Sequence, residues 1–115
     1  MVQEDSDPQF SREPQGNHFL RVVPYSRGFH FFKSIGNYTG ETATSLFSLV
    51  EMLKVVDLES VEFHFRRRDF ARWVREVIGD DALAERLNGV SAGLPSEDLR
   101  RALVKTVQAR IRELQ

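Results

Sequence analysis

From Leu46 to the end of the chain, apolar residues return every three or four positions, the spacing of one face of an α-helix. This repeat favours helices over strands, because a half-buried strand places its apolar residues at every second position. It is interrupted at residue types that commonly cap helix N-termini: Asp57, Asp69, Asp80 or Asp81, and Ser96. The sequence therefore predicts several successive helices that pack into one bundle, the first of them capped by Thr42, Thr44 or Ser45.

The segment over residues 60–66 is compatible with two structures. Its apolar residues alternate with polar ones, as in a half-buried strand, whereas Leu58, Val61 and Phe65 have the spacing of a helix. We favour the helix, because Asp57 can cap it and the neighbouring segments are helical. The strand remains the alternative.

Ahead of the helical part, aromatic and β-branched residues are concentrated between residues 18 and 33. They predict two short strands, over residues 18–24 and 28–33, joined by a turn at Ser26, Arg27 and Gly28. An isolated hairpin has little stability, so it must pack on the helices. The expected fold class is mostly α (α+β): a four- to five-helix bundle with a small N-terminal β-hairpin.

The first 17 residues differ in composition from the rest of the chain. They hold four acidic residues against one arginine, a net charge of −3, together with two prolines. We expect a disordered acidic N-terminal tail over residues 1–17 and a single globular domain over residues 18–115. A docking segment that becomes ordered on a partner is the alternative for the tail.

Composition excludes several classes of function. The chain has no cysteine, which removes disulfides, thiolate metal sites and cysteine nucleophiles. The spacing of His18, His30 and His64 matches no metal motif, so we predict neither a metal site nor a cofactor. A formal charge of −1 argues against nucleic-acid binding, and no apolar run has the length of a membrane span. The acidic start is unlike a signal peptide, so we expect a cytoplasmic protein.

The segment over residues 34–45 has the most unusual composition, with two glycines and many hydroxyl groups. If it joins a strand to a helix, backbone N–H groups and the side chains around Tyr38, Thr39, Gly40 and Thr42 could bind an anion. An ordinary turn followed by a helix cap uses the same residue types. The segment lacks the Gly-Lys-Ser/Thr sequence of a P-loop.

A second candidate site is His64 with the three arginines that follow it, Arg66, Arg67 and Arg68. Imidazole titrates near neutral pH, so His64 could act as a general base or hold a ligand. A base needs an orienting carboxylate and a pocket, and the sequence identifies neither. A buried histidine bonded to the backbone is the simpler interpretation, and a salt-bridged surface is the simpler one for the arginines. We predict no catalytic residue.

The central half of the chain, from Phe29 to Leu87, carries a recognisable pattern. It runs from an aromatic strand and a glycine turn to a Ser-Leu helix start, an aromatic-His pair, Asp-Phe-x-x-Trp and Gly-Asp-x-x-Leu-Ala. The matching residues are Phe29, Phe31, Gly40, Ser45, Leu46, Phe63, His64, Asp69, Phe70, Trp73, Gly79, Asp80, Leu83 and Ala84. The pattern resembles a prokaryotic family catalogued under number 5752 among domains of unknown function. The resemblance implies a folded module that is not secreted, and no particular reaction.

Three functional hypotheses follow. The first is a non-enzymatic protein-interaction or regulatory module that presents Tyr38, His64 and residues 66–68 to a protein partner or a second copy. The alternative is a small-ligand or anion-binding domain that uses the turn from Gly36 to Ser45 with His64 and the nearby arginines. An enzyme is the third, and the missing catalytic constellation counts against it.

Overall fold

The computed structural model describes residues 18–115, and the predicted acidic tail lies outside them. The described chain is mostly helical, with one two-stranded antiparallel sheet, which confirms the expected fold class. The sheet consists of β2 (Phe29–Phe32) and β3 (Tyr38–Ala43). The helices are α3 (Leu46–Val55), α4 (Leu58–Arg66), α5 (Asp69–Trp73), α6 (Asp81–Asn88) and α7 (Ser96–Leu114). The short elements are a 3-10 turn, η1 (Tyr25–Arg27), and a π-helical segment, η2 (Val74–Ile78), which continues α5.

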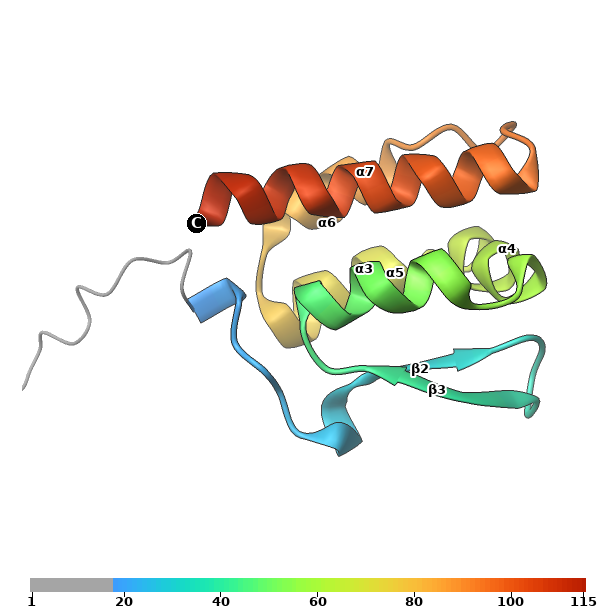
Figure 1. Cartoon of the computed structure of the whole chain (residues 1–115), viewed down its shortest axis with the longest axis horizontal. Coiled ribbons are helices and arrows are strands. Elements are labelled where there is room, and N and C mark those ends of the chain that lie inside the picture. The colour runs from blue at the N-terminus through green and yellow to red at the C-terminus, as the bar shows by residue number, and fades with distance from the viewer. Residues whose placement is uncertain (1–17) are drawn as a thin grey trace, which may run out of the picture.

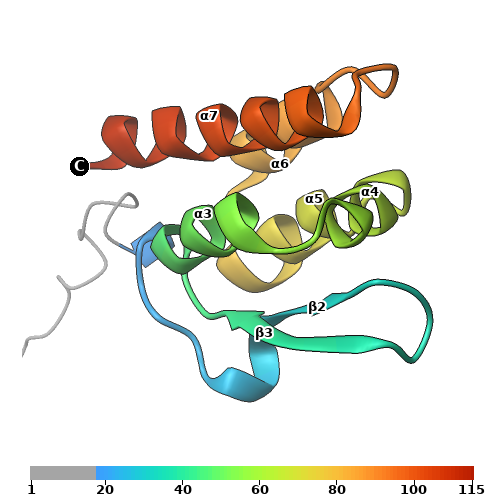
Figure 2. The same ribbon diagram turned by 45° about the vertical axis from the view of Figure 1, so that its right-hand side comes forward.

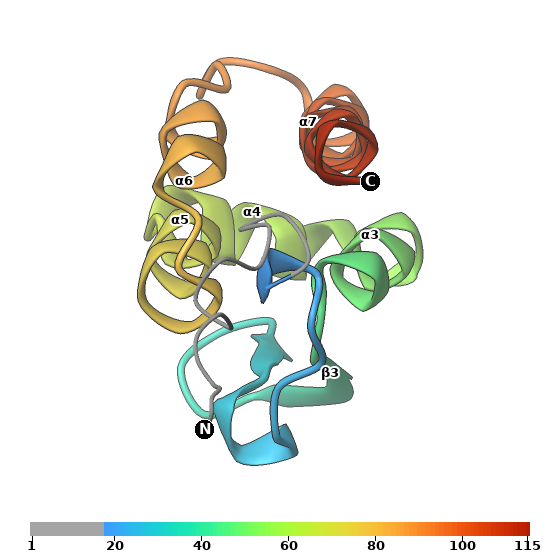
Figure 3. The same cartoon turned by 90° about the vertical axis from the view of Figure 1, so that its left-hand side faces the viewer.

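The elements form three layers. Helices α3, α4 and α5 lie in the middle, with the hairpin on one side and α6 and α7 on the other (Figures 1 and 3). The turned view shows the same order (Figure 2), and the closest helix pairing across the layers is that of α3 with α7. The middle layer is therefore covered on both sides, and the hairpin packs through β3 on α3 and through β2 on α4.

The hairpin lies further along the chain than predicted. β2 falls within the expected second strand, but its partner is β3, in the segment interpreted as a turn and helix cap. Residues 18–24, predicted as a strand, begin with a helical turn and continue without regular structure. The sequence Tyr-Thr-Gly-Glu-Thr-Ala of β3 has no apolar alternation, because most of its side chains are at least partly solvent-accessible, so the hydrophobic pattern does not reveal the strand.

Gly28 permits the close approach of the chain to β3. A Cβ atom at Gly28 would lie 2.7 Å from the side chain of Thr42 and 2.9 Å from the carbonyl oxygen of Ala43. The predicted turn therefore contains a glycine that is needed for packing against β3.

Residues 58–66 form a helix, as favoured over the strand, and α4 buries Ser60, Val61 and His64. Ser45 caps α3 through a reciprocal pair of hydrogen bonds with Ser48. Asp57 precedes α4 as expected, but its side chain makes no capping bond and instead lies 3.1 Å from Lys33 Nζ. The ion pair joins the end of the hairpin to the start of α4.

Two other predicted caps have different roles. The residue before α5 is Arg68, in the left-handed conformation with φ 63°, so Asp69 is the first helical residue rather than the cap. Ser96 is likewise the first residue of α7, and its hydroxyl donates to Glu62 of α4. In both cases the side chain that the local pattern assigned to a cap is bonded instead to a residue of α4: Asp69 to His64, and Ser96 to Glu62.

Asp80 is a true cap and also a buried ion-pair partner. Its Oδ1 accepts from the N–H of Leu83 at 3.1 Å, and its carboxylate accepts two bonds from Arg110 of α7, at 2.8 and 3.0 Å. Gly79, with φ 94°, ends the π-helical segment and turns the chain toward α6. The ion pair of Asp80 with Arg110 therefore joins the start of α6 to α7.

The core is continuous through the three layers and includes Phe29, Phe31 and Phe70 beside aliphatic residues of every helix. Trp73 is buried, and its indole N–H donates to the carbonyl of Arg27 at 2.8 Å. Among residues 18–115, every helix is too short or too polar to cross a membrane.

Candidate functional site

An open cleft of about 360 Å³ lies where the hairpin meets α4 and α5. Its lining residues are Gly28, Phe29, His30, Phe32, Ser34, Ile35, Gly36, Phe63, His64, Arg67, Asp69 and Trp73. We call this the aromatic cleft, because half of its lining residues carry rings, which come from the hairpin, α4 and α5. Ile35, in the turn between the strands, is 76% exposed although it is fully apolar. An exposed apolar side chain beside an aromatic hollow is typical of a binding surface.

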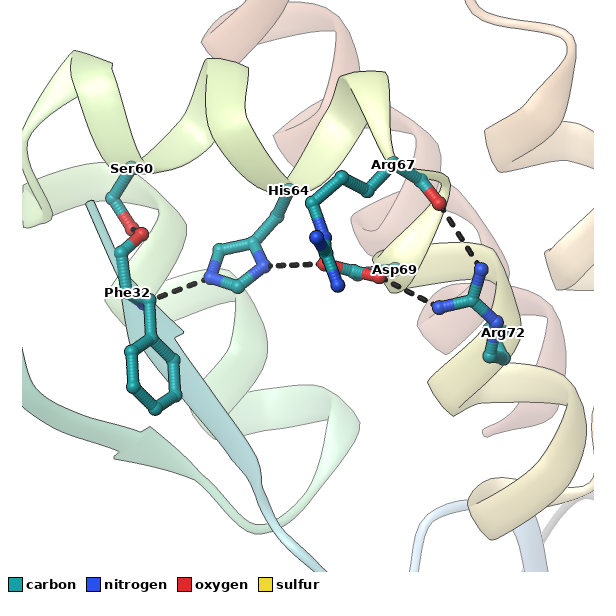
Figure 4. A network of polar contacts seen from close by, with 6 residues as sticks. All are labelled: Phe32, Ser60, His64, Arg67, Asp69 and Arg72. Atoms are coloured by element: carbon teal, nitrogen blue, oxygen red, sulfur yellow. Dashed lines mark hydrogen bonds and ion pairs between the residues drawn. The ribbon is translucent and has the colours of Figure 1, made fainter. Parts of the chain in front are cut away.

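Two side chains of α4, one of which lines the cleft, bind the hairpin edge (Figure 4). Ser60 and His64 lie one helical turn apart and point to the same side of α4. The hydroxyl of Ser60 donates to the carbonyl of Phe32 at 2.8 Å, and the N–H of Phe32 donates to Nε2 of His64 at 2.8 Å. Both backbone polar groups of Phe32 are thereby satisfied by α4, as a neighbouring strand would satisfy them.

The other ring nitrogen of His64, Nδ1, lies 2.8 Å from Oδ2 of Asp69. Because Nε2 accepts a bond, Nδ1 must carry the proton and donate to the carboxylate, which defines a neutral imidazole. Burial is the largest influence on the pKa of His64 and lowers it; the hydrogen bond and charge of Asp69 raise it, the charge of Arg67 lowers it, and the net shift is downward. The ring is therefore neutral at pH 7, with no lone pair left for a substrate.

Asp69 is the centre of the polar network. Oδ2 also accepts from Nε of Arg67 at 3.0 Å, and Oδ1 accepts from Nη1 of Arg72 at 2.7 Å. Burial raises the pKa of Asp69, but the bonds from His64, Arg67 and Arg72 together lower it by more, so the carboxyl is ionised. Arg72 also donates to the carbonyl of Arg67 at 3.1 Å, which closes the network.

The sequence did not identify Asp69 as a site residue, because Asp before an apolar run is typical of a cap. The available signal was spacing: Asp69 lies five residues after His64, two after Arg67 and three before Arg72. The αL residue Arg68 turns the chain between α4 and α5, so that Asp69 can return to His64. Spacing alone does not predict that turn, since Arg rarely adopts a positive φ.

The arginines predicted as one group are separated. Arg67 lines the aromatic cleft, and its guanidinium carbon lies 5.0 Å from the centre of the Phe63 ring. Arg66 lies 3.7 Å from Glu62, and it lines a different hollow together with Arg68. Only Arg67 therefore shares a site with His64.

The predicted residues of the glycine-rich segment lie on β3 or beside it. Gly36 lines the aromatic cleft with His64, whereas Tyr38, Thr39, Gly40 and Thr42 do not line it. The hydroxyl of Thr39 donates to the carbonyl of Phe31 at 2.9 Å, and Gly40 has a positive φ of 93°. These two residues shape the hairpin.

Tyr38 extends the aromatic surface beyond the cleft. Its ring centre lies 5.4 Å from that of Phe32 and 5.9 Å from that of His30, both of which line the cleft. Its hydroxyl lies 2.6 Å from Oγ1 of Thr42 and 2.9 Å from the hydroxyl of Tyr25. The outer face of the hairpin and the cleft thus form one continuous aromatic surface.

Within residues 18–115, no three side chains of His, Cys, Asp or Glu come together as metal ligands. The carboxylate of Asp69 is already occupied by three donors. The polar groups of the cleft are therefore bonded mainly to one another. The Nη nitrogens of Arg67 can still donate hydrogen bonds to an additional acceptor.

The fold and the site define a class of small α+β domain, in which a helical bundle carries one hairpin and an aromatic cleft lies at their junction. The chain belongs to a family of unknown function, DUF5752, whose profile matches residues 26–115. The match confirms the resemblance seen in the sequence and extends it from Leu87 through α7. No curated protein and no solved structure is significantly similar to the chain.

Proposed function

We propose that this domain is a non-enzymatic protein-interaction module, and that the aromatic cleft binds a short segment of a partner protein. The segment would insert one apolar or aromatic side chain into the cleft and bring a carboxylate to Arg67. The observation that carries the proposal is an open aromatic cleft beside the exposed side chain of Ile35. Exposed Tyr38 and Tyr25 continue this surface on the hairpin.

The occupied histidine supports binding rather than catalysis. A general base must present a free lone pair to the substrate, but Nε2 of His64 accepts the N–H of Phe32. The same bonds make the cleft rigid, which favours binding because little conformational entropy is lost when a partner segment enters.

Charge favours a partner segment that carries a carboxylate. Two guanidinium groups, of Arg67 and Arg72, share the single carboxylate of Asp69, which leaves one positive charge beside the cleft. Arg67 donates to Asp69 through Nε, and its two Nη atoms make no hydrogen bond within residues 18–115. Such an outward guanidinium edge can receive a carboxylate through two parallel bonds.

A cytoplasmic setting in a prokaryotic cell forms part of the proposal. The cysteine-free sequence favours it. The partner is accordingly another cytoplasmic protein.

A blocked peptide with a central phenylalanine between aspartates, titrated into the ¹⁵N-labelled protein, tests the proposal. We expect saturable amide shifts at Gly28, Ser34 and Gly36, and weaker shifts with a peptide in which lysines replace the aspartates. Ile35→Ser and Arg67→Gln should each weaken binding about fivefold, which corresponds to roughly 1 kcal/mol.

The matched control is Phe47→Ser, because Phe47 is an exposed apolar residue of α3 that lines a different hollow. This variant should bind the peptide as the unmodified protein does. Shifts that map to α3 and α7, or equal losses in the Ile35 and Phe47 variants, would contradict the proposal. Concentration-dependent shifts at the cleft without peptide would identify a second copy as the occupant.

A small-molecule ligand is the second candidate, because the cleft volume lies in the range of about 300–1,000 Å³ typical of such sites. Of the residues predicted for this alternative, Gly36, His64 and Arg67 line the cleft. Phenylacetate separates the two candidates, since it carries the ring and the carboxylate without a peptide backbone. Binding of phenylacetate as tight as that of the peptide would favour the small ligand.

A further inference from the structure

A smaller cavity lies on another part of the molecule, between the C-terminal end of α3 and the first half of α7. These two helices run side by side (Figures 1 and 2). The cavity has a volume of about 200 Å³ and is lined by Lys54, Arg100, Arg101, Val104 and Lys105. We propose that it binds a phosphate-type oxyanion, either free phosphate or the phosphate group of an ester.

The sequence gathers these cations through helical spacing. Arg100 lies one helical turn before Val104, and Arg101 one turn before Lys105, since positions four apart are neighbours on a helix surface; these two adjacent rows of α7 line the cavity. Lys54 approaches from the last turn of α3. Four of the five lining side chains are therefore cationic, although the chain as a whole has a charge of −1.

Nearby carboxylates balance this charge incompletely. Lys54 lies 3.6 Å from Glu51 and Arg100 lies 3.8 Å from Glu97, and both carboxylates are largely exposed. Arg101 pairs with Asp98, whereas Lys105 has no ion-pair partner within the described part of the chain. Exposed pairs of this kind are weak, so an oxyanion with several oxygens can compete for the same donors.

Arg100 is fixed in place before any ligand arrives. Its Nη1 donates to the carbonyl of Leu53 at 3.0 Å and its Nη2 to that of Val56 at 2.8 Å, and the side chain is only 15% exposed. The C-terminal carbonyls of a helix would ordinarily repel an anion, but here the guanidinium neutralises them. Its Nε is the one buried side-chain polar atom in residues 18–115 without a hydrogen-bond partner. The cavity thus combines a rigid, partly desolvated positive charge with three adaptable ones.

The composition of the cavity selects the ligand class. Every polar side chain that lines it is a donor without acceptor capacity, which suits an oxyanion and disfavours a cation or a neutral polar group. No aromatic ring lines it, so a nucleobase would find no stacking surface. A phosphate dianion engages several donors at once, whereas a monocarboxylate engages fewer with half the charge.

Titration of the ¹⁵N-labelled protein with inorganic phosphate, sulfate and acetate at constant ionic strength tests the inference. We expect phosphate and sulfate to shift the Nε–H resonance of Arg100 and the amide of Lys105 in a saturable manner, and acetate to have little effect. The double variant Lys54→Gln/Lys105→Gln should weaken phosphate binding about tenfold at low salt. Both lysines are at the surface, so the fold should be retained, and the fluorescence of Trp73 checks this.

The matched control is Arg112→Gln, which removes one exposed positive charge from α7 outside the cavity. It should change phosphate affinity by less than about twofold. The inference is overturned if all three anions produce the same unsaturated shifts, or if the Arg112 variant weakens phosphate as much as the lysine variant. The aromatic cleft takes no part in this experiment, so its outcome is independent of the proposed peptide binding.

Discussion

One of the two hydrogen bonds between α4 and Phe32 of the hairpin can be removed by the substitution His64→Leu, which leaves the bond from Ser60 in place. Leucine retains an apolar side chain among the surrounding phenylalanines but removes the acceptor for Phe32 and the donor to Asp69. An unpaired buried N–H costs about 1–3 kcal/mol, and a hydrogen bond to a charged group contributes about 1.5–3 kcal/mol. Arg67 and Arg72 still donate to Asp69, which offsets part of the loss of the bond from His64. We therefore expect the free energy of unfolding to fall by about 2–4 kcal/mol, a large share of the total for a small domain.

Urea denaturation followed by tryptophan fluorescence measures this loss. Trp73 is the only tryptophan and is 7% exposed, so its emission reports unfolding without a label. Two matched variants separate the bonds: His64→Gln can place an acceptor near Phe32, and His64→Asn can place a donor near Asp69. Each should recover about 1–2 kcal/mol of the loss in His64→Leu. A loss below about 1 kcal/mol in the leucine variant, or no recovery in either amide variant, would refute the assigned network.

The same histidine predicts a pH dependence of stability. Its pKa in the folded protein lies below the ordinary value of 6.5, so the unfolded chain takes up a proton first as the pH falls. The contribution of neutral His64 is complete above pH 6.5 and is lost as the pH falls from 6.5 toward the folded pKa, by at most about 1.4 kcal/mol per pH unit. The contribution of Asp69 persists to lower pH, since its ordinary pKa is 3.8. If the free energy of unfolding changed with pH equally in the unmodified protein and in His64→Leu, this assignment would be contradicted.

Two further substitutions test the other side of the molecule. Arg110→Ala leaves the carboxylate of Asp80, whose side chain is 1% exposed, without its charge partner. We expect the free energy of unfolding measured in urea to fall by about 3–5 kcal/mol. The exposed control Arg112→Ala should lower it by less than about 0.5 kcal/mol. Gly79→Ala must adopt φ 94°, and we expect thermal melting to show a loss of about 1–2 kcal/mol, because L residues are strained in the left-handed region. An unchanged melting temperature in the Gly79 variant would show that the turn relaxes.

The helices could be predicted from the sequence because their determinants are local. The spacing of apolar residues places α3 and α7 on the core, and Ser45, Gly79 and Asp80 act at helix ends as their types suggest. The helix over residues 58–66 could also be chosen correctly, because the spacing of its apolar residues and its helical neighbours are local signals, although Asp57 occupies the cap position without a capping bond from its side chain. None of these predictions required knowledge of a distant contact.

The hairpin and the polar network could not be predicted in the same way, because long-range contacts determine them. β3 has no apolar alternation, and it is a strand because β2 supplies its hydrogen bonds. Asp69 has the sequence position of a cap and the function of a network centre, since the αL turn at Arg68 brings it to His64. Local propensity describes the first role and contains no information on the second.

The polar network links the stability of the fold to the candidate binding site. A two-stranded sheet has little stability of its own, and here Ser60 and His64 supply the bonds that a third strand would give to Phe32. The same bonds join the hairpin to α4 (Figure 4), and both elements contribute lining residues to the aromatic cleft. Loss of the His64 bonds should therefore loosen the cleft before it unfolds the bundle, because the helices retain their own core. Under the proposed binding function, the buried histidine would act on a ligand indirectly, by holding the aromatic side chains in the geometry that a partner segment would meet.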